Sequence, residues 1–144
     1  MRKQTLRHAF TLVEMMVVIV ILGLLAGLVV PNLIGKSDDA KVKLTQIQIR
    51  QIGEALKLFK LDNGRYPTME EGLNALLKKP DNVDLPRYSN GGYLGGKNLP
   101  QDPWNKPFYY FNDGEDNIDV VSLGSDAKEG GEGDKADLKL SELR

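Results

Sequence analysis

Five carboxylates near the C-terminus are close enough in sequence to bind a metal ion together. They lie within the stretch SLGSDAKEGGEGDKAD, at Asp126, Glu129, Glu132, Asp134 and Asp137. Four glycines in the same stretch would let the backbone turn its carbonyl oxygens inward, and calcium takes about six to eight oxygen ligands from carboxylates, carbonyls and water. The spacing is not that of an EF-hand loop. The residues alone leave two interpretations open, a calcium-binding loop and a solvated acidic loop with little apolar content.

A single glutamate near the N-terminus is the second candidate for chemistry. Glu14 stands in AFTLVEMMVVIVILGLLAGLVVP, where the sixteen residues from Met15 to Val30 have no polar side chain. A helix that crosses a bilayer needs about 20 mostly apolar residues, so the run is just long enough. A charge at that depth costs about 3 kcal/mol or more, and such residues tend to be functional. Glu14 is therefore a candidate functional residue.

Catalytic patterns are missing from the sequence. There is no cysteine, which excludes disulfides, thiol catalysis and cysteine-based zinc sites. The one histidine, His8, belongs to no Ser-His-Asp set, and GEGDK lacks the spacing of a phosphate loop. The net charge of −1 gives no electrostatic case for binding nucleic acid. We therefore expect neither an enzyme nor a nucleic-acid-binding protein.

Helical patterns fill the first half of the chain. Residues 10–62 predict one helix about 80 Å long, in which Pro31 could end or kink the helix. Its second half, residues 40–61, is amphipathic, with an apolar face that is typical of a helix packed on a core. Asp62-Asn63-Gly64 predicts its end. A second, shorter helix is expected in residues 66–80, where Thr68 and Glu71 form a capping box.

The second half of the chain predicts a small sheet. Residues 81–107 are rich in Pro, Gly and Asn and indicate an irregular loop. The runs FYYF (108–111) and NIDVVSL (117–123) predict a β-hairpin with a loop of about five residues. The stretch after residue 123 is rich in glycine and acid, with a weak apolar end. Helices followed by an antiparallel sheet give an α+β fold.

The N-terminus has the features of a targeting signal. Arg2, Lys3 and Arg7 precede the apolar run, which predicts a cytoplasmic N-terminus and places the remainder across the membrane. An ordinary signal peptide needs a small-x-small cleavage site after the apolar run, and VVPNLIGKSDDAK offers none. A plain anchor helix explains everything except Glu14.

These same residues carry a resemblance to a known family. AFTLVEMMVVIVILGLLAGLVVP resembles the class III signal of type IV pilins and pseudopilins. The strings LDNGRYPTMEEGLNAL, GGYL, LPQDPWNKPFYY and SLGSDAKEGGEGDKAD are similar to those of the major pseudopilins of type II secretion systems. Most other type IV pilins have a cysteine pair near the C-terminus, and this chain has none. The resemblance implies a type IV pilin-like fold, in which a long N-terminal helix packs on a small antiparallel sheet.

For the N-terminal part, the resemblance implies processing by a prepilin peptidase between Ala9 and Phe10, with N-methylation of Phe10. Residues 1–9 would be a cleaved leader, 10–35 a transmembrane and filament-core helix, and 36–144 a periplasmic globular domain. Glu14 would pair with the new amine of Phe10, in its own subunit or in the next one. The family nearly always has glycine in place of Ala9, so the efficiency of cleavage is left open.

For the C-terminal loop, the resemblance implies a structural calcium ion. Its ligands would come from Leu123, Ser125 and Asp126, together with Asp134 and Asp137 in a register that the sequence leaves open.

For function, the resemblance implies a single-pass protein of the bacterial inner membrane. It would polymerise into a periplasmic pseudopilus that drives folded proteins across the outer membrane. Minor pseudopilins and an inner-membrane assembly platform would be its partners. Two alternatives are a type IV pilin of a surface pilus, used for adhesion or DNA uptake, and a membrane-anchored domain that never polymerises.

Overall fold

The structure is a computed structural model that describes residues 11–81, 83–114 and 117–143, without the side chains of residues 26–36. It divides into two compact units, residues 1–37 and 38–144. The leader expected at residues 1–9 and the cleavage site between Ala9 and Phe10 lie outside the described residues. The expected division at residues 9 and 35 stays a prediction.

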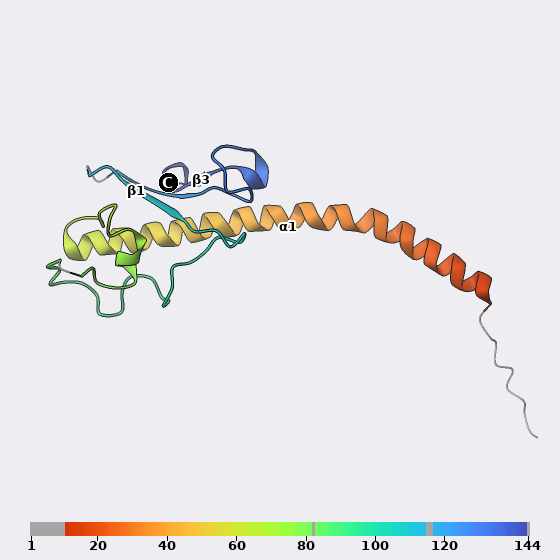
Figure 1. The fold of residues 1–144 in the computed structure, drawn as a ribbon, viewed down its shortest axis with the longest axis horizontal. Coiled ribbons are helices and arrows are strands. Elements are labelled where there is room, and N and C mark those ends of the chain that lie inside the picture. The colour runs from red at the N-terminus through yellow and green to blue at the C-terminus, as the bar shows by residue number, and fades with distance from the viewer. Residues whose placement is uncertain (1–10, 82, 115–116, 144) are drawn as a thin grey trace, which may run out of the picture. The chain divides into compact units, whose positions relative to one another are not determined.

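One long helix, α1, runs from Leu12 to Asn63 and contains 52 residues (Figure 1). It continues through Pro31, so of the two outcomes that the sequence left open at this proline, the helix does not end there. The helix ends where Asp62-Asn63-Gly64 predicts, and the Gly64 N–H donates to the carbonyl of Lys60 at 2.7 Å.

Within the described residues, none of the helical segments is both long enough and apolar enough for a membrane crossing. The crossing expected at residues 10–35 lies partly outside them, at Phe10 and at the side chains of residues 26–36.

The core of the second unit forms between α1 and a three-stranded antiparallel sheet. The sheet order is β1-β2-β3, with β1 at Tyr109–Asn112, β2 at Ile118–Ser122 and β3 at Leu138–Lys139. The predicted hairpin is confirmed, because β1 and β2 pair with Tyr110 opposite Val120. Helix and sheet share one cluster of buried side chains, which includes Ile49, Ile52, Ala55, Leu56, Phe59, Phe108, Tyr110, Ile118 and Val120.

The second helix is much shorter than the sequence predicts. Only a four-residue 3-10 helix, η1 (Leu73–Leu76), forms in this region. Gly72 precedes it with φ of 56°, in the left-handed region that interrupts an α-helix. The capping box at Thr68 and Glu71 is nevertheless present, and Leu73 and Leu76 are buried.

The C-terminal segment contributes more structure than its weak apolar pattern predicts. It adds β3, which pairs with β2, and the 3-10 helices η2 (Gly133–Lys135) and η3 (Leu140–Glu142). Leu140 is buried directly against α1 at Gly53, where a Cβ atom would lie 2.8 Å from the Leu140 Cδ1. Asp119 on β2 accepts hydrogen bonds from the Ser141 N–H and hydroxyl.

Candidate functional site

Glu14 caps the helix that it opens. Its Oε2 accepts hydrogen bonds from the Thr11 N–H at 2.9 Å and from the Thr11 hydroxyl at 3.2 Å. The Glu14 N–H donates to Thr11 Oγ1 at 3.2 Å in return. This reciprocal pair is a capping box, in which a threonine and a glutamate three residues later satisfy two free helix donors. The sequence pattern T-x-x-E could have predicted it here, as it did at Thr68.

The carboxylate of Glu14 keeps one oxygen available. Among the described residues, its Oε1 has no hydrogen bond and no cation pairs with the carboxylate. Phe10, whose amine is the expected partner, lies outside them. The helix that follows exposes a continuous apolar surface, with every large hydrophobic side chain from Leu12 to Leu25 at least 44% exposed. An apolar surface of this size marks a site of contact with protein or with a membrane.

The acidic loop brings some of the predicted metal ligands together. The Ser125 N–H donates to the backbone carbonyl of Asp134 at 2.8 Å, which joins the two ends of the loop. Asp137 accepts from the Gly130 N–H through Oδ2 at 3.1 Å, while its Oδ1 is buried without a hydrogen-bond partner. An unpartnered buried carboxylate oxygen is costly, and a cation would relieve that cost.

Glycines hold this loop closed. Gly124 is buried, and a Cβ there would lie 2.7 Å from the carbonyl oxygen of Asp134. Gly131 has φ of 93°, and its Cβ would lie 2.5 Å from the carbonyl oxygen of Lys135. The loop is therefore built on close backbone approaches to residues 134–136 that only glycine permits.

The five acidic side chains of the loop do not all point to one metal site. In the part of the chain that the structure describes, no three acidic or histidine side chains are grouped as metal ligands. Asp126 is exposed and accepts from the Lys128 N–H at 3.2 Å, as in an Asx turn. Glu129 and Glu132 are also exposed. A cation at Asp137 would thus depend on carbonyl oxygens and water for most of its ligands.

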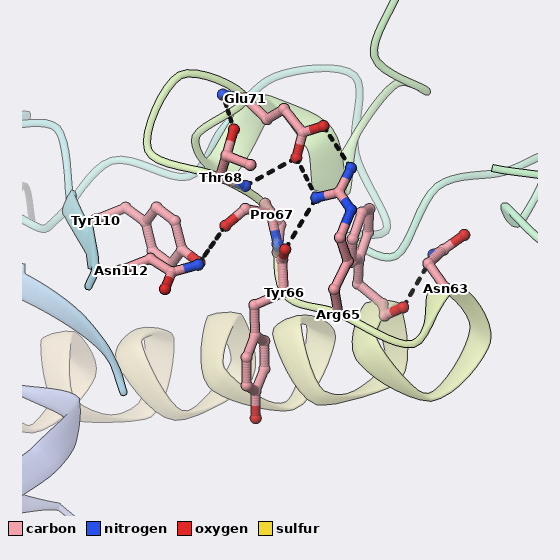
Figure 2. Close-up of polar contacts among 9 residues, drawn as sticks. Asn63, Arg65, Tyr66, Pro67, Thr68, Glu71, Tyr110 and Asn112 are labelled. Atoms are coloured by element: carbon pink, nitrogen blue, oxygen red, sulfur yellow. Dashed lines mark hydrogen bonds and ion pairs between the residues drawn. The ribbon is translucent and has the colours of Figure 1, made fainter. Parts of the chain in front are cut away.

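An ion pair that sequence reasoning missed lies beside the second capping box. The Arg65 guanidinium binds both carboxylate oxygens of Glu71, at 2.6 and 2.7 Å, and also donates to the Tyr66 carbonyl at 3.0 Å (Figure 2). Glu71 at the same time accepts from the Thr68 N–H at 2.8 Å. The hydrogen bond from Arg65 lowers the pKa of Glu71, and the same bond raises the pKa of Arg65. The arginine three residues before T-x-x-E was the available signal.

The same segment is fastened to the sheet through Pro67. Its carbonyl accepts from the Tyr110 hydroxyl at 2.9 Å and from the Asn112 side-chain amide at 2.7 Å (Figure 2). Burial raises the pKa of Tyr110 to about 12. These bonds join the connection after α1 to β1, and they are structural rather than catalytic.

Asp102 is a further residue that the sequence did not reveal. The residue is 2% exposed, and its carboxylate accepts from the Ser122 hydroxyl at 2.8 Å and from the N–H groups of Trp104 and Lys106. A buried carboxylate that accepts three hydrogen bonds needs no catalytic role to explain it. It attaches the loop before β1 to the end of β2.

Comparison with known proteins identifies the family that the chain matches. Residues 32–141 match the family described as type II secretion system (T2SS), protein G, and residues 5–30 match the prokaryotic N-terminal methylation motif. The chain is 48% identical over 139 residues to the type II secretion system core protein G of Vibrio cholerae, covering 96% of this chain and 92% of that protein. It is 41% identical over 146 residues to the protein of the same name from Escherichia coli K12, covering 100% and 99%.

The fold has a solved counterpart. The crystal structure of the major pseudopilin from the type 2 secretion system of enterohaemorrhagic Escherichia coli matches with a TM-score of 0.64 and 36% identity. The match covers 81% of this chain and 95% of that one. The predicted architecture, a long N-terminal helix with a small antiparallel sheet, is thereby confirmed.

Proposed function

Because the chain belongs to the type II secretion system protein G family, we propose that it is the pseudopilin subunit that polymerises into the filament of such a system. It is a structural protein rather than an enzyme. The observation that carries the proposal is the uncovered apolar surface of Leu12–Leu25, at whose start Glu14 keeps one carboxylate oxygen available. That surface and that charge both need partners from outside the described residues.

In this proposal, Glu14 has two tasks. Oε2 caps its own helix through Thr11, and Oε1 accepts the amine that cleavage before Phe10 creates. A prepilin peptidase removes residues 1–9, and the methylation motif at residues 5–30 supports this processing. The ion pair offsets the desolvation of both charges when the helices pack together. Glu14 then sets the axial position of one subunit against another.

The location and the partners follow from the family. The basic leader and the apolar run support insertion in the inner membrane, with residues 36–144 in the periplasm. Minor pseudopilins and an inner-membrane assembly platform are the further partners that the proposal requires. The match to protein G over residues 32–141 favours a secretion filament over a surface pilus. It also favours assembly over a membrane-anchored domain that never polymerises.

Structural calcium in the acidic loop is the second part of the proposal. The buried, unpartnered Oδ1 of Asp137 supports it, and so do the close backbone approaches at Gly124 and Gly131. Asp137 would supply a carboxylate, and the neighbouring carbonyls, Leu123 and Ser125 among them, would supply neutral oxygens. Asp126 and Asp134 are the remaining candidates. Bound calcium would hold the loop against the sheet.

The assembly proposal is tested at Glu14. Glu14→Ala removes the cap and the charge, whereas Glu14→Gln keeps an oxygen that can accept from Thr11. We expect both variants to be made and processed, and both to lose filaments and secretion, because the charge is what the amine needs. Filaments are counted by electron microscopy, and secretion is measured by the enzyme released from cells. Glu70→Ala, an exposed acid in the second unit, is the matched control. Normal secretion by Glu14→Gln would contradict the proposal.

The calcium proposal is tested by thermal unfolding of the full chain in detergent, with calcium and with a chelator. At free calcium about 100 times the Kd, the ion should stabilise the fold by about 2.7 kcal/mol. Asp137→Ala should abolish the difference, and Glu132→Ala, an exposed acid in the same loop, should keep it. Identical melting curves with calcium and with chelator would rule out the site.

A further inference from the structure

The outer face of the sheet carries two exposed aromatic rings. Along β1, Tyr109 and Phe111 alternate with the buried Tyr110, so their side chains lie on the face of the sheet that turns away from α1. The two residues are 44% and 50% exposed. Val121 stands opposite Tyr109 in the register and shares this face, since it is buried without belonging to the core cluster. Exposed aromatic residues gathered on one face are typical of a binding surface.

These residues line a groove of about 530 Å³, which we call the sheet groove. Its apolar part consists of Tyr109, Phe111, Val121 and Leu123. Three carboxylates and one ammonium group complete the lining, from Asp119, Glu129, Asp137 and Lys139. The volume lies within the range of about 300–1,000 Å³ that is usual for ligand sites. The sheet groove therefore has room for several side chains of a ligand.

The edge of β1 limits how such a ligand binds. At Asn112 the backbone N–H already donates to the Met69 sulfur at 3.1 Å, and the side-chain amide donates to the Pro67 carbonyl at 2.7 Å. A peptide that adds a strand to a sheet needs free backbone groups along the edge. Since the edge is covered at Asn112, we expect the ligand to contact the face of the sheet with its side chains.

The sheet groove lies in a strongly acidic part of the chain. Residues 113–142 contain ten acidic and three basic side chains, a net charge of −7, whereas residues 38–112 contain nine acidic and eleven basic ones, a net charge of +2. A calcium ion in the acidic loop would still leave residues 113–142 at −5. Among the described residues, neither Asp119 nor Glu129 has an ion-pair partner. A surface of this sign attracts cationic partners and repels acidic ones.

We propose that the sheet groove binds a basic segment of a different protein, in which arginine or lysine alternates with apolar residues. The apolar side chains of that segment contact Phe111 and Val121. Its cation lies against the aromatic rings, where the ring faces attract positive charge. The carboxylates of Asp119 and Glu129 lie in the same lining and supply the opposite charge.

The occupant is a different protein because of where the sheet groove lies in the second unit. It is on the face of the sheet that turns away from α1, and α1 is the element through which the proposed filament is built. A filament joined through α1 leaves this face open to other proteins. The inference therefore adds a partner surface to the proposed function, rather than another contact between subunits.

Peptide binding to the full chain in a nonionic detergent tests the proposal, and it does not depend on whether filaments form. The probe is the peptide Gly-Leu-Arg-Leu-Arg-Leu-Gly with a neutral fluorescent dye, and its anisotropy reports binding. One comparison peptide has glutamate in place of each arginine, and another has serine in place of each leucine. We expect saturable binding of the probe, about tenfold tighter than that of either comparison peptide. Salt at about 0.5 M should weaken it, because exposed charges are screened.

Variants of the sheet groove locate the binding. Phe111→Ser and Glu129→Lys should each weaken the probe about tenfold, since one removes a ring and the other reverses a charge in the lining. Glu132→Lys is the matched control, because it changes the net charge equally but lies outside the groove, and it should change the affinity less than about twofold. Unchanged thermal unfolding of Phe111→Ser and Glu129→Lys shows that both variants are folded.

Three results would overturn the proposal. The first is equal binding of the glutamate peptide, and the second is full binding by Phe111→Ser and Glu129→Lys. The third is no saturation with the probe up to about 1 mM, the weak end of specific affinities. Displacement of the bound probe by unlabelled chain at micromolar concentration would also contradict it, because the groove would then bind a second copy. None of these results bears on filament assembly, which Glu14→Gln tests separately.

Discussion

Thr11–Glu14 and Thr68–Glu71 form the same capping box in two settings. The threonine N–H donates to the glutamate at 2.9 Å in the first and 2.8 Å in the second, and the return bond measures 3.2 Å in both. The first box opens a helix of 52 residues, and the second precedes a 3-10 helix of four. Identical local chemistry therefore does not decide how much helix follows.

The two glutamates differ in their charge partners. Arg65 binds both oxygens of Glu71 within the same domain, whereas no described residue pairs with Glu14. The box at Thr68 is thus complete within one chain and serves stability. The box at Thr11 leaves a charge for another group to neutralise, as an assembly contact requires. The following variants test this difference between the two capping boxes.

Removal of the internal partner should have the largest effect. Arg65→Ala leaves the Glu71 carboxylate, with its side chain 10% exposed, without its cation. We expect a loss of about 2 kcal/mol in the free energy of unfolding, since hydrogen bonds to charged groups contribute about 1.5–3 kcal/mol and Arg65 is partly solvated. Chemical denaturation of the full chain in detergent measures it.

The double variant Arg65→Ala/Glu71→Gln controls for the charge left behind. It should be more stable than Arg65→Ala alone, because a neutral amide is cheaper to bury than an unpaired carboxylate. If Arg65→Ala unfolds at the same denaturant concentration as the unsubstituted chain, the ion pair contributes nothing to stability and the contrast with Glu14 is lost.

Removal of the capping threonine hydroxyl should reduce stability by a smaller amount, and only in the box at Thr68. Thr68→Ala should cost about 1 kcal/mol, as loss of an N-cap side chain usually does. Thr11→Ala should leave the melting temperature unchanged, because none of the described side chains in the unit that holds Thr11 belongs to the buried core. Thermal unfolding of the two variants side by side measures this. Equal destabilisation would show that the boxes are energetically alike.

Lowering the pH should produce the smallest difference in stability between the unsubstituted chain and Arg65→Ala. The folded state lowers the pKa of Glu71 below its usual value of 4.5, so its stabilisation is fully present above that pH and is lost as the pH falls through the lowered pKa. Stability of the unsubstituted chain should therefore fall as the pH drops below 4.5 and through the lowered pKa of Glu71. The fall should be shallower in Arg65→Ala, and denaturant melts along a pH series detect it. Equal slopes would mean that Arg65 does not control this titration.

Periodicity and turn residues predicted the long helix, its end at Asn63 and the β1–β2 hairpin. These features depend on local patterns, which a sequence displays directly. The N-terminal motif at residues 5–30 could also be recognised from the sequence, because its residues are contiguous.

The sequence-based predictions failed where the structure depends on the fold rather than on a local pattern. The second helix stopped short because Gly72 adopts a left-handed conformation, which composition alone does not reveal. Strand β3 has two residues, too few for a pattern, and exists because β2 offers it a free edge. The ion pair of Arg65 and the buried Asp102 depend on the folded positions of their partners.

The contact of Leu140 with Gly53 has a consequence for how the chain is made. The notch at Gly53 appears early in synthesis, and the side chain that fills it comes 87 residues later. A nascent chain that emerges N-terminus first therefore cannot complete its core until residue 140 is free of the ribosome. Until residue 140 has been added, the notch at Gly53 stays unfilled, so the core of the second unit closes only after the C-terminal residues are in place.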